Sequence, residues 1–215
     1  MATTSGSAHP RPETKRKREE ILRAAIETFG TKGSTNGTLS DIAEQVGMTH
    51  AGVLHHFGSK QKLLLEVLDF RDQDDVAHLA DQHIPGGPAL FMHLVHTMIR
   101  NAARPGIVQV YTVLSAESVT EEHPAKDYFH DRYRVLRDDV DAAFRELCEQ
   151  EGVTDPTSID KASAAILAVM DGLQLQWLLD PAVVDLAEAS EFAIQAIVNA
   201  VLRPGPGLST YVREE

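Results

Sequence analysis

The chain has 215 residues, of which 43% are hydrophobic, and its 32 Asp and Glu against 20 Lys and Arg give a net charge of −12. This length allows one large domain, or a small domain fused to a larger one, with a substantial core. The single cysteine excludes an intrachain disulfide and fits a reducing compartment. The first twelve residues lack the apolar centre of a signal peptide, and polar residues interrupt the most apolar segment, 162–179. We therefore expect a cytoplasmic protein with no membrane partner.

The negative charge is unevenly distributed along the chain. Residues 1–70 hold nine Lys and Arg against eight Asp and Glu, whereas residues 71–215 hold eleven against twenty-four. The acidic excess therefore belongs to the second part. The first part keeps its basic residues at particular places, which leaves nucleic-acid binding open.

A basic run stands at the start of the first expected helix. Residues 1–13 are rich in Ser, Thr and Pro, which predicts a disordered arm. An amphipathic helix follows and ends before Gly33. A solvated helix start is one interpretation of the run. We favour contact with DNA phosphates, because positive charge is unfavourable beside the positive end of a helix dipole. The run consists of Lys15, Arg16, Lys17 and Arg18.

Residues 38–60 predict two short helices joined by a tight turn. Thr38 stands where an N-cap is expected, with Asp41 as a carboxylate variant of the capping box. Gly47 can end the first helix in the left-handed conformation. One apolar stripe recurs at i, i+3, i+4 and i+7 along this helix; its residues are Leu39, Ile42, Ala43 and Val46.

The second of these helices offers a small, polar surface at its N-terminus. Thr49 is its expected N-cap, and Val53 and Phe57 face inward. A recognition helix presents a surface of this kind to the major groove of DNA. The outward residues of the first turn are Thr49, His50, Ala51 and Gly52.

Together these motifs resemble the DNA-binding domain of the TetR family of bacterial transcriptional repressors. The resemblance covers about residues 14–67 and rests on Thr-x-x-Asp-Ile-Ala, Val-Gly-Met-Thr, an Ala-Gly pair, His-His-Phe and Ser-Lys in this order. The family usually has tyrosine where this chain has Leu54, so one phosphate contact is absent and we expect His55 to take part of that role. The resemblance implies that residues 49–52 face the groove and that phosphates are contacted by Thr38, His55, His56 and Lys60.

Ser59 and Lys60 can also be interpreted without the family. Ser59 is a good N-cap for the next helix, and Lys60 and Lys62 lie in its first turn. These lysines are either solvated or placed to meet a phosphate at the helix N-terminus. We favour the phosphate because the helix-turn-helix motif is adjacent.

The rest of the chain predicts helices only, because no alternating strand pattern or hairpin signal appears between the helical periods. A connecting helix ends at about residue 82, before the sequence IPGGP. Further helices are expected at 89–103, 107–119, 124–151, 157–179 and 184–202. The predicted fold is all-α with about nine helices. It comprises a helix-turn-helix domain at 14–67, a larger ligand-binding and dimerisation domain at 68–203, and a loose tail at 204–215.

The last two helices are apolar on more than one face, and such helices need more than one partner. One interpretation makes them the central helices of a monomer. The family resemblance implies instead that they pair with their copies in a four-helix interface, and a homodimer doubles the contact on a palindromic site. The expected interface residues are Ile166, Met170, Leu173, Phe192, Ile197 and Val201.

Polar or bulky residues on otherwise apolar helices are candidates for a ligand pocket. Tyr and Trp at helical spacing are also common core residues with one satisfied polar atom. The family has its inducer cavity among these helices, which implies that some of the set lines a pocket for a small, mainly organic molecule. The candidates are His93, His96, Tyr111, Glu117, Tyr128, Tyr133, Asp171, Gln174 and Trp177.

No catalytic or cofactor motif appears in the sequence. His93 and His96 have a spacing compatible with metal ligands, but further ligands are missing, so we expect an ordinary pair, no metal and no cofactor. The main hypothesis is a homodimeric repressor of a palindromic double-stranded DNA operator, released by a small-molecule effector and without enzyme activity. The alternatives are a helical enzyme or metal-binding protein, and a ligand-binding protein that no longer binds DNA.

Overall fold

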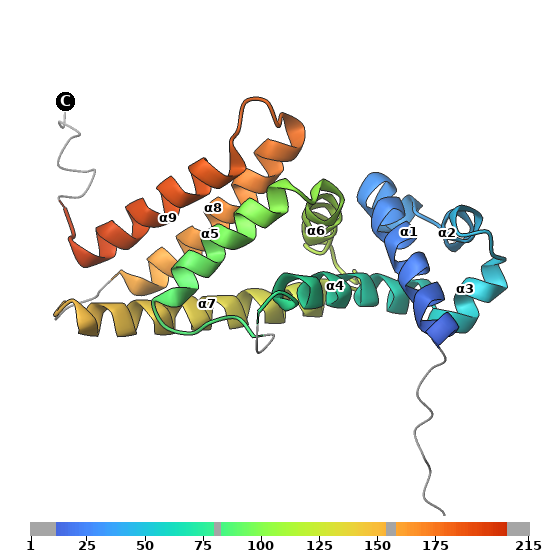
Figure 1. Cartoon of the computed structure of the whole chain (residues 1–215), viewed down its shortest axis with the longest axis horizontal. Helices are drawn as coiled ribbons and strands as arrows, with labels where there is room; N and C mark the ends of the chain where they lie inside the picture. Colours follow the sequence, from blue (N-terminus) through green and yellow to red (C-terminus); the bar gives the residue numbers. More distant parts are fainter. Residues whose placement is uncertain (1–11, 80–82, 154–157, 206–215) are drawn as a thin grey trace, which may run out of the picture.

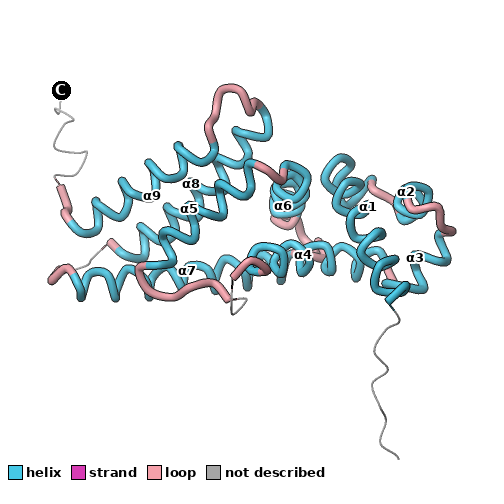
Figure 2. Tube along the Cα trace, viewed as in Figure 1, coloured by secondary structure: helices cyan, strands magenta, loops and turns pink. Residues whose placement is uncertain are grey.

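The structure is a computed structural model that describes residues 12–79, 83–153 and 158–205. These residues form nine helices, and the described ranges contain no strand (Figure 2), which confirms the predicted all-α fold. Most of the expected arm at 1–13 and tail at 204–215 lies outside the described residues. The helices are α1 (Pro12–Asn36), α2 (Leu39–Gln45), α3 (His50–Phe57), α4 (Lys60–Val76), α5 (Ala89–Ala102), α6 (Pro105–Glu117), α7 (Lys126–Gln150), α8 (Ile159–Leu179) and α9 (Leu186–Leu202).

The helix-turn-helix unit of α2 and α3 is fixed by local caps. The Thr38 hydroxyl accepts the Asp41 backbone N–H at 3.1 Å, and the Asp41 carboxylate accepts the Thr38 backbone N–H at 2.9 Å. Hydrogen bonds from Lys32 and Thr38 hold the pKa of the Asp41 carboxyl well below its ordinary value. Gly47 has a φ of +61°, which lets the chain turn between the two helices without the clash of a Cβ atom. The predicted capping box and turn are therefore confirmed.

Helix α1 differs from the predicted first helix at both ends. It begins at Pro12, because proline is tolerated in the first turn, where no intrahelical N–H bond is made. The basic run at 15–18 therefore begins one turn inside the helix, which weakens the argument from the helix dipole. At the other end, Gly33 has a φ of +73° and kinks the helix, which resumes and continues to Asn36.

Two other helix boundaries differ from the prediction. Helix α4 ends at Val76, well before residue 82, and the Arg100 guanidinium of α5 donates to the backbone oxygens of Asp74 and Asp75 at 2.9 and 2.7 Å. These bonds satisfy carbonyls that a longer helix would have used. The helix expected at 107–119 begins earlier, because Pro105 is the first residue of α6, the position at which proline fits best.

The molecule is elongated, with α1, α2 and α3 at one end, α5, α7, α8 and α9 at the other, and α4 reaching between them (Figure 1). One apolar core runs through α1 to α4 and continues into Val110 and Leu114 of α6 and Phe129 of α7. Helix α1 lies close against α6 at Gly30, where an added Cβ would stand 3.4 Å from the Val110 backbone nitrogen. The end formed by α1, α2 and α3 and the second domain therefore share a core across the expected boundary at 67–68.

A second apolar core joins α5, α7, α8 and α9. By length and composition, α8 is long and apolar enough to cross a membrane, although polar residues interrupt the segment 162–179 and the sequence predicted no span there. One such helix is weak evidence for a span, because a core helix of a soluble protein passes the same test. Ile166 and Met170 of α8 are buried against the other helices, as expected for a core helix.

Candidate DNA-binding surface and ligand cavity

The first turn of α3 presents the predicted groove-facing residues, with one difference. The Thr49 hydroxyl accepts the Gly52 backbone N–H at 3.1 Å, and His50 and Ala51 are exposed. Gly52 is half-buried, and an added Cβ would stand 2.9 Å from the Met48 methyl group. Gly52 therefore faces Met48 and not the solvent, so the outward surface is formed by Thr49, His50 and Ala51.

The residues expected to contact phosphates differ in their exposure. Thr38 and His55 are exposed. His56 is half-buried, and burial together with the neighbouring His55 and Arg18 lowers the pKa of its imidazole, so it is neutral at pH 7. The Lys60 ammonium donates to the Thr35 backbone oxygen at 3.2 Å, which leaves two of its three N–H donors.

The basic run divides into an exposed half and a packed half. Lys15 and Arg16 are exposed. The Lys17 ammonium donates to the Val46 backbone oxygen at 2.9 Å and so holds α1 against the end of α2. The Arg18 guanidinium bonds the Glu66 carboxylate and the His56 backbone oxygen, and its Cζ lies 4.2 Å from the centre of the Phe57 ring. Lys17 and Arg18 therefore have packing contacts, whereas Lys15 and Arg16 remain exposed, with Arg16 3.8 Å from Glu20 Oε1.

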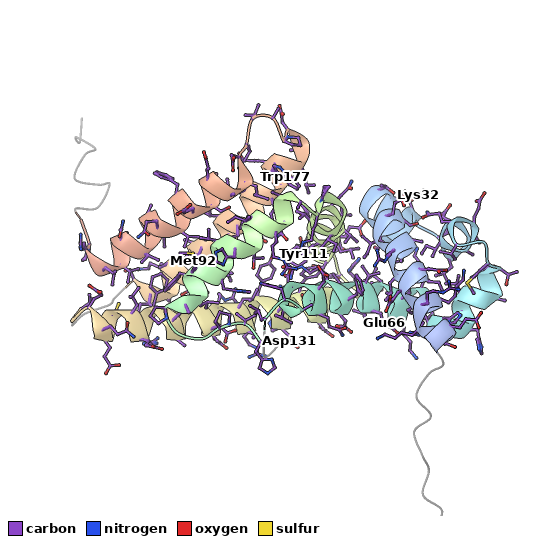
Figure 3. All side chains as sticks on the ribbon, in the orientation of Figure 1. Lys32, Glu66, Met92, Tyr111, Asp131 and Trp177 are labelled. Atoms are coloured by element: carbon purple, nitrogen blue, oxygen red, sulfur yellow. The ribbon has the colours of Figure 1, made fainter. Side chains whose placement is uncertain are left out.

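A cavity of about 440 Å³ lies in the second domain, between α4, α5, α6, α7 and α8. Figure 3 labels Tyr111 near the place where α4 and α6 come together. A cavity of this size suits a small organic ligand. Five of the predicted pocket residues line it: His93, Tyr111, Tyr133, Asp171 and Gln174.

The other four predicted pocket residues do not line this cavity. His96 is exposed, and Trp177 packs in the apolar core near the end of α8 (Figure 3). The Tyr128 hydroxyl donates to Asp72 Oδ2 at 2.6 Å beside the cavity. Glu117 lies at the junction with α1. Helical spacing in the sequence assigned these residues to helices of the second domain but could not show which side chains point into one cavity.

The charged groups of the cavity wall mostly neutralise one another. Arg71 lies 2.9 Å from Asp72 Oδ1 and 3.0 Å from Asp75 Oδ2, and Arg132 lies 2.6 Å from Asp72 Oδ1. Arg104 adds a contact of 2.9 Å to Asp75 Oδ1. Burial alone would raise the pKa of Asp75, but Arg71, Arg104 and Arg132 outweigh it and lower that pKa. These side chains come from α4, α7 and the α5–α6 junction, so the network ties α4 to the second domain.

Asp171 lies outside this network of ion pairs. Its Oδ2 accepts the Tyr133 hydroxyl at 2.5 Å, and it forms no ion pair with any described residue. Burial raises the pKa of this carboxyl, partly offset by the Tyr133 hydrogen bond and by the charges of Arg71 and Arg132. Asp171 therefore lies on the cavity wall without a cationic partner among the described residues.

The sequence did not indicate several residues of the cavity wall. Asn101 is buried and donates to Gln174 Oε1 at 3.0 Å. Arg71 and Asp72 belong to an acidic stretch that resembles a solvated helix face, and Arg132 belongs to another. An arginine followed at i+4 by a carboxylate was the available signal, but surface helices carry the same pattern. The missed lining residues include Arg71, Asp72, Asp75, Thr97, Asn101, Arg132 and Asp139.

Glu117 joins α6 to the kink in α1. Its carboxylate accepts the Ser34 backbone N–H at 2.8 Å, and it occupies the space that a Cβ on Gly33 would need. His123 Nε2 lies 2.9 Å from the Ser34 hydroxyl and 3.7 Å from Glu117 Oε2. We call Ser34, Glu117 and His123 the junction latch, because they connect the DNA-binding end to the second domain.

The expected dimer residues also divide. Ile166, Met170 and Val201 are buried within the protomer, since they face the other helices of the second core, so their assignment to an interface is wrong. Leu173 and Ile197 are half-buried. Phe192 is 77% exposed. The large apolar side chains that are exposed on α8, on α9 and in the segment between them are Leu175, Leu179, Val183 and Phe192.

The predicted histidine pair does not converge on one point. His93 is buried, lines the cavity and stacks on His78 at 6.4 Å between ring centres, whereas His96 is exposed. Within the described ranges, no group of three or more His, Cys, Asp or Glu side chains is placed to hold a metal ion. Burial lowers the pKa of His93, so its imidazole is neutral at pH 7.

Both parts of the chain match models of known protein families. Residues 21–67 match the model of the tetR family of bacterial regulatory proteins, and residues 90–202 match that of the BetI-type transcriptional repressor C-terminal domain. The HTH-type transcriptional regulator BetI of Agrobacterium fabrum is 31% identical over 179 residues, which are 80% of this chain and 82% of that protein.

Solved structures show the same fold. SmeT, the repressor of the Stenotrophomonas maltophilia multidrug efflux pump SmeDEF, superposes with a TM-score of 0.69 at 20% identity, over 90% of this chain and 94% of its own. A regulator from Saccharomonospora viridis in complex with choline superposes with a TM-score of 0.66 at 21% identity, over 88% of this chain and 97% of its own. A complex of SmeT with triclosan is also among the similar structures, at a TM-score of 0.70 and 20% identity, over 88% of this chain and 93% of its own.

Proposed function

The chain belongs to the tetR family of bacterial regulatory proteins, with a C-terminal domain of the BetI type, and we propose that this repressor is a homodimer on a palindromic operator. In this proposal a small organic molecule in the cavity releases the DNA. The chain is a transcriptional regulator and not an enzyme. The observation that carries the proposal is the exposed, capped first turn of α3, together with the exposed Lys15 and Arg16 at the start of α1 and the half-buried Lys60 at the start of α4.

DNA recognition would divide between positioning and base contact. Lys15, Arg16 and Lys60 supply positive charge for phosphates, which positions the protein without reading the sequence. His50 is the exposed side chain of the α3 turn that is long enough to reach a base edge. With Ala51 beside it, direct base contacts are few, so DNA shape would contribute to specificity.

The cavity is the proposed effector site. Its volume of about 440 Å³ and its mixed polar and apolar wall suit a small organic molecule. Similar structures contain choline in one case and triclosan in another, which shows that proteins of this fold hold such molecules. Those ligands belong to those proteins. For this chain the wall itself must indicate the ligand.

Dimerisation would use the outer face of α8 and α9. Leu175, Leu179 and Phe192 remain 48%, 78% and 77% exposed, so an apolar surface is open for a second copy. Two copies related by a two-fold axis would present two α3 helices to the half-sites of a palindrome. This assignment replaces the buried Ile166 and Met170 by side chains that a partner can reach.

Release of the DNA would pass through α4 and the junction latch. Arg71 and Asp72 of α4 line the cavity, and the same helix packs against α1 and α3 at the DNA-binding end. A ligand that contacts Arg71 and Asp72 could shift them and so change the orientation of α4 relative to the second domain. It would release DNA only if it bound the released arrangement more tightly, because equal affinity for both states shifts nothing.

Selection of genomic fragments by the purified full-length protein tests the proposal. We expect an enriched palindrome, and sedimentation of the protein–DNA complex should give two protomers per site. Fragments without a shared palindrome would favour a ligand-binding protein that has lost its DNA site. A single protomer per site would contradict the proposed dimer but not the proposed DNA binding.

A further inference from the structure

The cavity wall distinguishes between possible effector charges, and this inference rests on the proposed effector role of the cavity. Arg71 and Arg132 are the arginines of the wall, and both are engaged by Asp72, with Asp75 as a further partner of Arg71. An anionic ligand would have to displace the half-buried Asp72 or the buried Asp75 from these arginines. Breaking such a pair leaves the displaced carboxylate uncompensated in a poorly solvated wall, which is unfavourable. The wall therefore disfavours anions.

Two wall carboxyls remain without a cation. Asp171 accepts one hydrogen bond, from Tyr133, and Asp139 forms no ion pair with a described residue. Asp139 also lines a shallow depression that adjoins the cavity and shares Asp72 and Arg132 with it, so it stands at the cavity mouth. Acceptors thus lie both inside the cavity and at its opening. This arrangement suits a positively charged ligand.

The aromatic rings of the wall are poorly placed for a quaternary ammonium group. Such groups carry no N–H donor and are held by the open faces of several aromatic rings. Tyr111 is 5% exposed, and the guanidinium carbons of Arg71 and Arg132 lie over its ring at 4.5 and 5.5 Å from the centre. Tyr133 directs its hydroxyl to Asp171. No cage of free aromatic faces is formed by the described residues.

We propose that the effector is an organic amine that keeps N–H donors, with its ammonium group bound by Asp171 and its apolar body against Leu94, Leu167 and Met170. A protonated primary or secondary amine forms charge-assisted hydrogen bonds to a carboxylate, which a quaternary ammonium cannot form. The three apolar residues line the same cavity as Asp171. The ligand therefore differs in class from the choline held by the similar regulator from Saccharomonospora viridis.

Calorimetric titration of the full-length protein with three matched probes tests this inference. Hexylamine, hexyltrimethylammonium and 1-hexanol share one apolar body and differ in charge and in N–H donors. At pH 7 hexylamine is protonated, as an amine with a pKa near that of Lys, about 10.4. We expect hexylamine to bind at least about tenfold more tightly than the other two, since a charge-assisted hydrogen bond is worth about 1.5–3 kcal/mol.

Two variants show whether Asp171 is the acceptor. Asp171→Asn keeps an oxygen that can accept from Tyr133, removes the charge, and should abolish the preference for hexylamine while leaving 1-hexanol binding unchanged. Asp160→Asn, in the exposed first turn of the same helix, should leave all three affinities unchanged. Thermal unfolding of both variants checks that they are folded.

Some outcomes would overturn the inference. Equal or tighter binding of hexyltrimethylammonium or 1-hexanol would exclude an N–H-bearing amine, and so would the absence of binding by hexylamine. A preference for hexylamine that survives in Asp171→Asn would exclude Asp171 as the acceptor. Binding of the selected genomic DNA, measured on the same samples, separates this failure from failure of the proposed function. If DNA binding persists, only the effector class is wrong.

Discussion

The α3 surface and the cavity wall treat polar groups in opposite ways. On α3, His50 is exposed, and the cap that begins the helix is a bond between Thr49 and Gly52, three residues apart in sequence. In the cavity, Arg71 and Arg132 are buried or nearly so and are paired with carboxylates. Charged groups on an exposed surface can remain unpaired in the absence of DNA at little cost in free energy, because water solvates them. A buried wall must neutralise its own charges, so the carboxyl left unpaired is the informative one.

The largest expected effect comes from removing a charge of the buried network. Arg71→Met should lower the free energy of unfolding by about 3–5 kcal/mol, because Asp72 and Asp75 would be left with too little positive charge. Arg134→Met, at an exposed position with contacts of 3.6 and 3.7 Å, should change it by less than about 1 kcal/mol. Urea unfolding measures both. Equal changes in unfolding free energy would show that the cavity network contributes no more to stability than the exposed ion pairs of Arg134.

The junction latch should give a smaller effect. Glu117→Ala removes the acceptor of the Ser34 backbone N–H, and we expect a loss of about 1 kcal/mol in unfolding free energy together with weaker DNA binding. Glu121→Ala, an exposed change in the loop after α6, is the control. Urea unfolding and DNA titration measure the pair. Unchanged DNA affinity in Glu117→Ala would show that the latch does not connect the two ends.

Asp171→Asn should act in the opposite direction and stabilise the protein at neutral pH. Because burial raises the folded-state pKa of Asp171 above the unfolded value, ionising this carboxyl costs stability as the pH rises through that interval. The variant should therefore melt at a higher temperature than the parent at pH 7, and the difference should vanish below about pH 4, the ordinary pKa of Asp. A lower melting temperature at pH 7 would mean that Asp171 is favourably paired, contrary to the account of the cavity.

The smallest expected effect lies on the DNA surface. Lys60→Ala should weaken binding to all sequences alike and reduce the slope of log K against log salt by about one, as expected for one lost phosphate contact. Its ammonium already donates to Thr35, so a small structural effect is expected as well. Lys161→Ala, exposed on α8, should leave the slope unchanged. A change of base preference in Lys60→Ala would mean that this residue reads sequence.

The helix-turn-helix could be predicted because its signals are local. Thr38, Gly47 and Thr49 act on backbone groups within a few residues, so their roles can be read from spacing alone. The cavity depends on residues far apart in the chain. Asp72 and Arg132 meet across two helices, and nothing in either local sequence distinguishes a buried ion pair from a solvated one.

Helices α8 and α9 show a second limit of sequence reasoning. Both are apolar on several faces, and their periodicity does not say which face meets the protomer and which a partner. Ile166 and Phe192 were assigned to one interface, yet the first is fully buried in the protomer and the second is 77% exposed. Only the packing of α5 and α7 against these helices separates the two sets.

Binding of the selected palindrome by the parent and by His50→Ala tests whether α3 recognises the operator. We expect two protomers per palindrome and, for His50→Ala, a changed preference at the base pairs under α3 with an unchanged salt slope, because His50 is the long exposed side chain of that turn. An unchanged base preference, or a complex that does not depend on the palindrome, would contradict recognition through α3.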